Sequence, residues 1–460
     1  MMKHICLMIS IWLSCGLHMA WAEDTSTHTP MVDEYTHIDM YTTTPKKEAS
    51  ITLMPASTIA RPQLSRQDNA ALHLSLLRDE VDHITKVGFF GAWFDTNEAL
   101  QQALMRDIAL YLHIYSDLPI AAEAMQLKGD MLAKQNNTEA ATVAYLQTIY
   151  EFPNTPSARQ SKKKVLALVA EDWSEEEKTI QHIAKSVPDG NTATRLRLLS
   201  SALYPIENKE MVVALTLLQL DILKRFPDDP HIDEVQVLLA HNMGADSAKA
   251  GIFGFKKLLA LYPNSNYRPE AMLAIADLQR IRLKDYEKAE KNYQTLINSY
   301  PEHQLTKHAY VHLADTQANH LKKYTEAVET YATIVQLYPN DTVSLKALQH
   351  KANIEAKKLK AYQQAVVSLR QLATMFHSFE ATDALKDAIK IAEKKLKDDA
   401  LAFDIRQQLV RDYPNSDIAP KALFNMAEYK NDTTLYEQFL SQYPDHKLAK
   451  KVREKLQSGR

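Results

Sequence analysis

The sequence has 460 residues, of which 45% are hydrophobic and 24% charged, so it can bury a sizeable core and is not disordered as a whole. It has only nine glycines, far below the usual share of about 7%, which argues against hairpin-rich β architectures and glycine-rich phosphate-binding loops. Because 54 Lys and Arg residues face 57 Asp and Glu residues, the net charge of −3 excludes a general basic field for nucleic acid or an anionic membrane.

Residues 1–22 have the pattern of a signal peptide. Lys3 precedes an apolar stretch that is shorter than the roughly 20 residues of a membrane-spanning helix, and Ala20-Trp21-Ala22 has the small-x-small pattern of a cleavage site. We therefore expect cleavage near Ala22 and a periplasmic or secreted protein.

Both cysteines, Cys6 and Cys15, lie in this segment, so the mature chain is expected to contain neither a disulfide nor a thiolate. The alternative is a lipoprotein, because Leu13-Ser14-Cys15-Gly16 partly matches a lipidation motif. An acyl chain on Cys15 would place the protein on the outer membrane.

Residues 23–65 are rich in Thr, Ser and Pro and lack a helical apolar period, which predicts a flexible leader. The alternative is a segment that wraps around the folded body, since Ile51, Leu53, Met54 and Ile59 are apolar. We expect an N-terminal helical cap to follow over residues 66–115.

An aromatic residue followed by proline recurs through the rest of the chain. Three such pairs, Tyr262-Pro263, Tyr300-Pro301 and Tyr338-Pro339, lie 38 residues apart, and four further pairs continue the lattice: Phe152-Pro153, Phe226-Pro227, Tyr413-Pro414 and Tyr443-Pro444. Proline at regular intervals marks helix ends, so the spacing predicts a repeat of helices.

The interior of the repeat recurs with the same period. Three sets of residues align: Ala276, Ala314 and Ala352; Tyr286, Tyr324 and Tyr362; and Ala289, Ala327 and Ala365. The pattern predicts one helix to about Leu283, a turn at Lys284-Asp285 and a second helix that ends at Tyr300. Alanine at both marked positions predicts a close crossing of the two helices.

The order Ala276, Ala289, Tyr293, Pro301 resembles the tetratricopeptide repeat, although that family usually has a period of 34 residues and a Trp in the first helix. The longer repeat ending in Tyr/Phe-Pro is similar to exported bacterial members, such as the barrel-assembly lipoprotein BamD and the periplasmic Tol-Pal-associated coordinator. The resemblance implies an all-α fold, a right-handed α-solenoid over residues 116–444. We expect about nine helical hairpins from residue 66 to residue 444. A basic capping helix is expected over residues 445–460.

The resemblance also implies a non-catalytic scaffold that binds proteins or peptides on a concave surface lined by first helices. No cofactor, metal or nucleic acid is expected, and a membrane only through Cys15. The process would be outer-membrane assembly, cell-wall coordination or polysaccharide export. The alternative is the helical support of a peptidoglycan-acting enzyme, such as a lytic transglycosylase. If the family register holds, six residues face the groove, unless they are merely solvated: Asp277, Arg280, Asp315, Asn319, Asn353 and Lys357.

Three other patterns have competing interpretations. His308 and His312 are spaced to share a metal ion on one helical face, or they are solvated. Ser161-x-x-Lys164 has the spacing of a serine nucleophile and its lysine, or it belongs to a solvated helix. The aromatic segment 88–94 is either core of the N-terminal cap or a partner contact, whereas Gly251 and Phe255 fall at packing positions of the repeat.

Overall fold

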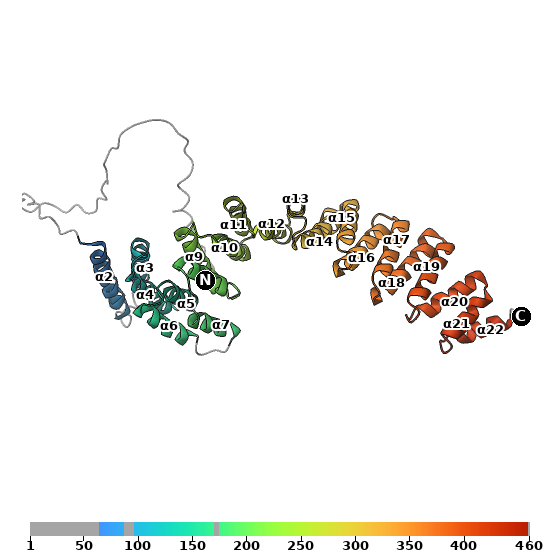
Figure 1. Cartoon of the computed structure of the whole chain (residues 1–460), viewed down its shortest axis with the longest axis horizontal. Helices are drawn as coiled ribbons and strands as arrows, with labels where there is room; N and C mark the ends of the chain where they lie inside the picture. Colours follow the sequence, from blue (N-terminus) through green and yellow to red (C-terminus); the bar gives the residue numbers. More distant parts are fainter. Residues whose placement is uncertain (1–63, 87–95, 170–173, 459–460) are drawn as a thin grey trace, which may run out of the picture. The chain divides into compact units, whose positions relative to one another are not determined.

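Helices account for every regular element in the computed structural model, which describes residues 64–86, 96–169 and 174–458 (Figure 1). These residues belong to one compact unit, Leu64–Arg460. The predicted signal peptide, all but the last two residues of the predicted leader, and the whole aromatic segment 88–94 lie outside the described residues.

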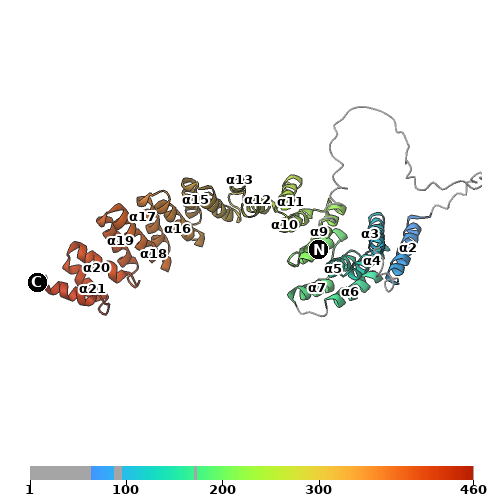
Figure 2. The same cartoon turned by 180° about the vertical axis from the view of Figure 1, so that it is seen from behind.

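The described helices form ten successive pairs and a closing helix, and Figures 1 and 2 show them following one another in chain order. The pairs are α2 (Arg66–Lys86) with α3 (Thr96–Tyr115), α4 (Ala121–Lys134) with α5 (Thr138–Glu151), α6 (Pro156–Leu168) with α7 (Glu175–Lys185), α8 (Thr192–Leu203) with α9 (Lys209–Arg225), α10 (Ile232–Asp246) with α11 (Ala248–Leu261), α12 (Arg268–Asp277) with α13 (Tyr286–Ser299), α14 (Thr306–Asp315) with α15 (Tyr324–Leu337), α16 (Thr342–Lys357) with α17 (Tyr362–Met375), α18 (Phe379–Ile391) with α19 (Asp399–Asp412), and α20 (Ala419–Lys430) with α21 (Thr433–Gln442). The closing helix is α22 (Ala449–Ser458). The sequence predicted about nine pairs from residue 66 to residue 444, and the structure has ten there. The count was uncertain at the N-terminal end because α2 and α3 carry no aromatic-proline pair.

The aromatic-proline pairs end second helices, as predicted. The aromatic residue is the C-cap of α5, α9, α11, α13, α15, α19 and α21. The proline that follows has no N–H to continue the helix. Several helices begin at a short polar side chain that caps them, and at the start of α7 Ser174 and Glu177 form a capping box.

Small residues lie where the two helices of a pair cross. Ala276 and Ala289 are fully buried and belong to one apolar cluster with Tyr293, as the repeat pattern predicted. A Cβ added to Gly251 would lie 2.5 Å from the Cα of Gly244, so α10 and α11 meet backbone to backbone. The prediction that Gly251 is a packing position is confirmed.

Four turns within pairs place a lysine in the left-handed region: Lys284, Lys322, Lys360 and Lys397 have φ between 54° and 59°. The backbone N–H that follows each lysine bonds to a carbonyl six residues earlier, as from Asp285 to Gln279 at 2.9 Å. Three of these first helices end in π-helical segments: η3 (Leu278–Leu283), η4 (Thr316–Leu321) and η5 (Ala392–Leu396). The turn therefore comes one residue later than in an ordinary helix end.

The C-terminal end of the array is covered by α22. Its Val452 is buried, and the Lys451 ammonium lies 3.1 Å from Glu428 and 4.6 Å from the ring centre of Phe424. Across the described ranges, every helix is too short or too polar to span a bilayer.

Candidate functional site

A polar cluster joins the first helices of two consecutive pairs. At its centre is the carboxylate of Asp277, at the end of α12. The hydroxyl of Tyr293 donates to Asp277 Oδ1 at 2.5 Å, and His312 Nδ1 of α14 lies 2.9 Å from the same oxygen. Arg280 Nε in turn donates to the Tyr293 hydroxyl at 3.0 Å. The cluster thus connects the pair α12–α13 to α14.

The cluster continues along the next first helix through Asp315. The guanidinium of Arg280 lies 3.9 Å from Asp315 Oδ2, and Asn319 donates a hydrogen bond to the same carboxylate. Asp277, Arg280 and Asp315 are half-buried and Asn319 is exposed.

Four of the six residues predicted to face a groove are therefore brought together. Asn353 and Lys357 lie exposed on α16, outside this cluster. Their position leaves both of the original interpretations open, so the assignment of the groove stays a prediction.

The electrostatics of the cluster favour an ionised aspartate beside a neutral tyrosine. Burial raises the pKa of Asp277, but the nearby His312 imidazole, the hydrogen bond from Tyr293 and the charge of Arg280 hold that pKa below its usual value. Burial and the bond to Asp277 raise the pKa of Tyr293 well above its usual value. The cluster is thus a set of paired charges with one exposed amide, Asn319, at its edge.

Sequence reasoning did not assign Tyr293 or His312 to this cluster. The ring of Tyr293 lies in the core, but its hydroxyl reaches the polar cluster. His312 was considered as a metal ligand with His308, which is exposed. Within residues 64–86, 96–169 and 174–458, no three His, Cys, Asp or Glu side chains form a group that could hold a metal ion.

Ser161 and Lys164 do not make a nucleophile pair of the expected kind. The Ser161 side chain is buried, whereas the Lys164 ammonium lies 2.5 Å from Asp130 and 5.8 Å from the ring centre of Tyr145. These contacts give Lys164 a structural partner. Neither side chain is simply solvated, because Ser161 is fully buried and Lys164 is paired with Asp130.

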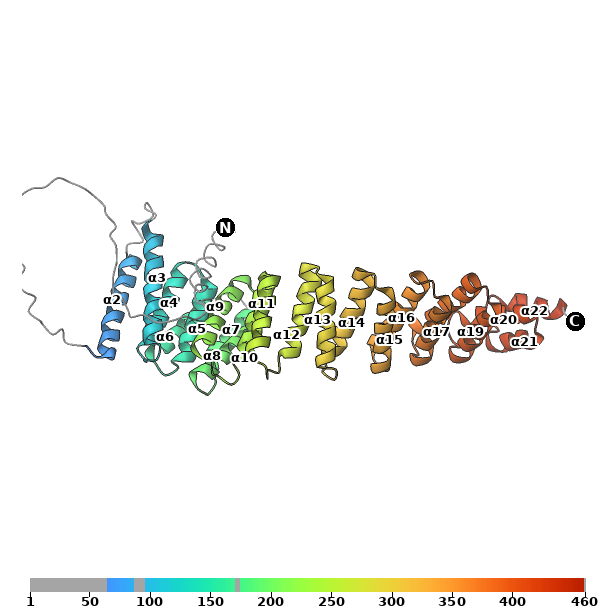
Figure 3. The same cartoon turned by 90° about the horizontal axis from the view of Figure 1, so that it is seen from above.

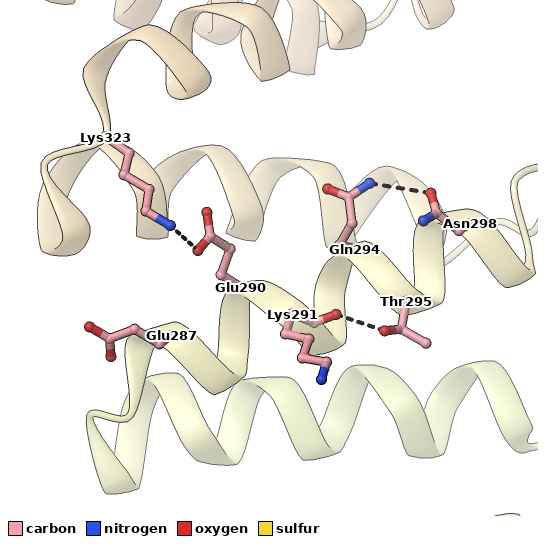
Figure 4. Close-up of a pocket in the computed structure, with 7 residues that line it drawn as sticks. All are labelled: Glu287, Glu290, Lys291, Gln294, Thr295, Asn298 and Lys323. Atoms are coloured by element: carbon pink, nitrogen blue, oxygen red, sulfur yellow. Dashed lines mark hydrogen bonds and ion pairs between the residues drawn. The ribbon is translucent and has the colours of Figure 1, made fainter.

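A shallow hollow lies over the second helix α13 and beside Lys323, the N-cap of α15 (Figure 4). It has a volume of about 390 Å³ and is lined by Glu287, Glu290, Lys291, Gln294, Thr295, Asn298 and Lys323. Lys323 donates to Glu290 at 2.6 Å across one end of it. Small-molecule sites are mostly apolar and enclosed, and this hollow is polar and open, so it does not suggest such a site.

The residues of the polar cluster coincide with a recognised repeat. The family model of the tetratricopeptide repeat matches residues 270–303 and 308–341, which contain Asp277 to Tyr293 and His312 to Asn319. These two segments are tetratricopeptide repeats, and repeats of this family form scaffolds for protein interactions. No curated protein matches the chain.

Several solved structures resemble the chain at low identity. The structure of Pseudomonas aeruginosa pilF is 17% identical and covers 52% of this chain and 96% of its own, with a TM-score of 0.30. The type IV pilus biogenesis factor PilW is 16% identical and covers 51% of this chain and 100% of its own, with a TM-score of 0.30. A tetratricopeptide repeat protein from Parabacteroides merdae is 13% identical and covers 58% of this chain and 97% of its own, with a TM-score of 0.33. At these TM-scores, none of them supports an inference about function.

Proposed function

We propose that this chain is a non-catalytic scaffold of the bacterial cell envelope that holds protein or peptide partners on the surface of its first helices. The observation that carries the proposal is the polar cluster from Asp277 to Asn319. It runs along the first helices of both recognised repeats, the surface on which such repeats usually bind peptides.

The charges of the cluster suit a binding surface more than a reaction centre. Asp277 and Arg280 are engaged with each other and with Tyr293, so they hold the surface in place. Asn319 and Asn353 are exposed amides at the first helices of two consecutive pairs, and an amide can donate to and accept from the backbone of an extended peptide. Such a surface can bind a polar partner through hydrogen bonds, whether or not that partner carries a net charge.

The envelope location rests on the sequence pattern of residues 1–22. Cleavage near Ala22 gives a periplasmic or secreted scaffold, and acylation of Cys15 gives one anchored to the outer membrane. The intact mass of the mature N-terminus separates the two, and a chain that keeps residues 1–22 in the cytoplasm contradicts both.

Affinity capture from the native envelope tests the binding surface. The tagged full chain is compared with the double variant Asn319→Lys and Asn353→Lys, which adds two charges on first helices. The matched control, Gln294→Lys with Asn298→Lys, adds the same charges to exposed positions of a second helix, α13. We expect the first variant to lose a defined set of partners and the control to keep it. Equal capture by all three proteins would contradict the assignment of the surface.

A further inference from the structure

The turns within four successive pairs form an edge of exposed lysines. We call this the lysine edge and define it by six residues: Lys284, Lys322, Lys357, Lys360, Lys394 and Lys397. Contacts from turn to turn show that the turns are neighbours. The rings of Tyr286 and His320 stack at 4.0 Å, and the ammonium groups of Lys358 and Lys395 lie 5.8 and 6.0 Å from the ring centres of Tyr324 and Tyr362 in the preceding turns. Figure 3 shows these pairs, from α12 to α19, in series.

The charges of the lysine edge are available to a partner. Among the ion pairs of the described residues, none uses any of the six lysines, and Lys322 donates only to the carbonyl of Asn319, at 2.5 Å. The carboxylates nearby are engaged elsewhere: Asp285 bonds to Lys288, Glu290 to Lys323 and Glu393 to Arg406. Four exposed carboxylates lie at the starts of the second helices that follow the turns: Glu287, Glu326, Asp398 and Asp399. Asp398 accepts a hydrogen bond from the N–H of Leu401.

Lysine is an unusual choice for four of these positions. The left-handed conformation favours glycine or asparagine, and the chain itself uses Asn136 and Asn431 at two other turns. A cation near a helix C-terminus is stabilised by the helix dipole, and a single lysine in each turn already provides this interaction. The two later turns carry three lysines each, at residues 357, 358 and 360 and at residues 394, 395 and 397. The excess points to recognition of an anion.

From this arrangement we infer that the lysine edge binds an extended acidic segment of a protein partner. The lysine-bearing turns recur once per helical pair and contact one another through Tyr286, Tyr324 and Tyr362, so an extended peptide that runs along them meets positive charge at each repeat. Leu283 and Leu359, 39% and 38% exposed, lie directly before Lys284 and Lys360 and provide apolar contacts between the charges. This inference rests on the proposed function and names a partner class for a second surface.

Two other anionic partners fit the edge less well. Single-stranded nucleic acid is held by stacking on free aromatic faces, and here Tyr286, Tyr324 and Tyr362 are each covered by a side chain of the next turn. A lipid surface is bound by a continuous face of bulky apolar groups that insert into it, whereas Leu283 and Leu359 are single side chains set between charges at separate turns.

A titration with the purified full chain tests the inference. The probe is a dye-labelled peptide with Glu at every third position and Ser or Leu between, and a peptide with Gln in place of Glu is the reference. The edge variant changes the four left-handed lysines to Asn, which this chain tolerates at equivalent turns. The matched control changes four exposed lysines on helices to Gln: Lys249, Lys256, Lys257 and Lys421.

We expect the acidic peptide to bind the wild type and the control alike, with an affinity that falls as salt rises, and the edge variant to bind roughly tenfold more weakly. Weak binding of the Glu peptide by the wild type, or equal losses in both variants, would overturn the inference.

Two other ligands test the partner class: oligouridine, and vesicles of phosphatidylglycerol and phosphatidylethanolamine. The partner class would be overturned if the wild type bound either of them more tightly than the peptide and the edge variant lost that binding. The Asn319→Lys and Asn353→Lys variant in the same titration separates the surfaces. If this variant still binds the acidic peptide, the lysine edge binds it without the surface of the first helices. That result is independent of the outcome of the capture experiment.

Discussion

The turn at Asn136 and the turn at Lys284 close similar helical pairs in different ways. At the first turn, the N–H of Asn137 bonds to the carbonyl of Leu132, five residues earlier, at 3.0 Å. At the second, the N–H of Asp285 reaches Gln279, six residues earlier, at 2.9 Å. The closing hydrogen bond of the second turn therefore spans one residue more than that of the first.

The same single residue separates the packing positions of the two pairs. Gly129 packs against Tyr145, and Ala141 follows Gly129 by twelve residues, whereas Ala289 follows Ala276 by thirteen. Both pairs keep small residues at the crossing of their helices. The comparison shows that the small residues at the helix crossing are kept in both pairs. The extra residue of the second pair is accommodated in the backbone of its turn.

The widened turns also carry polar bonds between their two helices. Gln279 accepts from Asn292 at 2.6 Å, and the equivalent pairs in the next two repeats, Thr330 with Gln317 and Ser368 with Glu355, bond at 2.8 and 2.7 Å. Each of the three pairs joins residues thirteen apart in the sequence. These bonds satisfy polar groups that the longer turn leaves at the helical interface.

The largest expected effect concerns the crossing itself. Gly251→Ala places a Cβ 2.5 Å from the backbone of Gly244, and backbone cannot move aside as a flexible side chain can. We expect a loss of about 3 kcal/mol in the local free energy of opening of α10 and α11, measured by amide hydrogen exchange. The exposed neighbour Lys249→Ala is the control, with a change within about 0.5 kcal/mol. Equal protection in both variants would show that the crossing is not fixed.

The crossing made by alanines should tolerate an added side chain somewhat better. Ala289→Leu overpacks the contact of α12 with α13, where Ala276 and Tyr293 are fully buried, and we expect a loss of about 2 kcal/mol. Urea denaturation, with hydrogen exchange to locate the effect, measures it. Lys291→Leu, on the exposed face of α13, should leave the midpoint almost unchanged. An unchanged midpoint in Ala289→Leu would contradict the packing assignment.

A smaller and pH-dependent effect is expected from Asp277. Its folded-state pKa lies below the value in the unfolded chain, so its ionised form stabilises the fold above that unfolded value, about pH 4. This stability is lost as the pH falls through the folded-state pKa.

Asp277→Asn should therefore cost about 1.5 kcal/mol at neutral pH and show a shallower loss of stability below about pH 4 than the wild type. Denaturation at a series of pH values gives both quantities. Parallel pH curves for the two proteins would mean that Asp277 does not titrate differently in the folded state.

The smallest expected effect tests the left-handed turns. Lys360 has φ of 54°, a backbone conformation that glycine adopts without steric strain. Lys360→Gly should therefore raise the free energy of unfolding by about 0.5 kcal/mol, and Lys360→Val, with its branched Cβ, should lower it by about 1 kcal/mol. Thermal denaturation of the two variants measures the difference. A valine variant as stable as the glycine variant would contradict the left-handed assignment.

Much of the fold could be predicted because its signals are local. Proline after an aromatic residue ends a helix wherever it occurs, and alanine at both packing positions indicates a close crossing, so the end of η3 at Leu283 and the start of α13 at Tyr286 agree with the predicted turn at Lys284-Asp285. The pair formed by α2 and α3 was not part of the lattice because it lacks these signals.

The cluster and the lysine edge were not predictable in the same way. Glycine or asparagine would have indicated a left-handed turn, but Lys284 and Lys322 give no such signal. The contact of Asp277 with His312 depends on how one helical pair packs on the next, which a spacing of residues within one pair does not specify.

Site-specific photo-cross-linking in intact cells tests the central claim, that partners are held on the first helices. A photoreactive amino acid replaces Asn319 in one variant and Asn298, exposed on α13, in another. We predict discrete cross-linked envelope proteins from position 319 and none of these from position 298. The same products from both positions, or from position 298 alone, would contradict the claim.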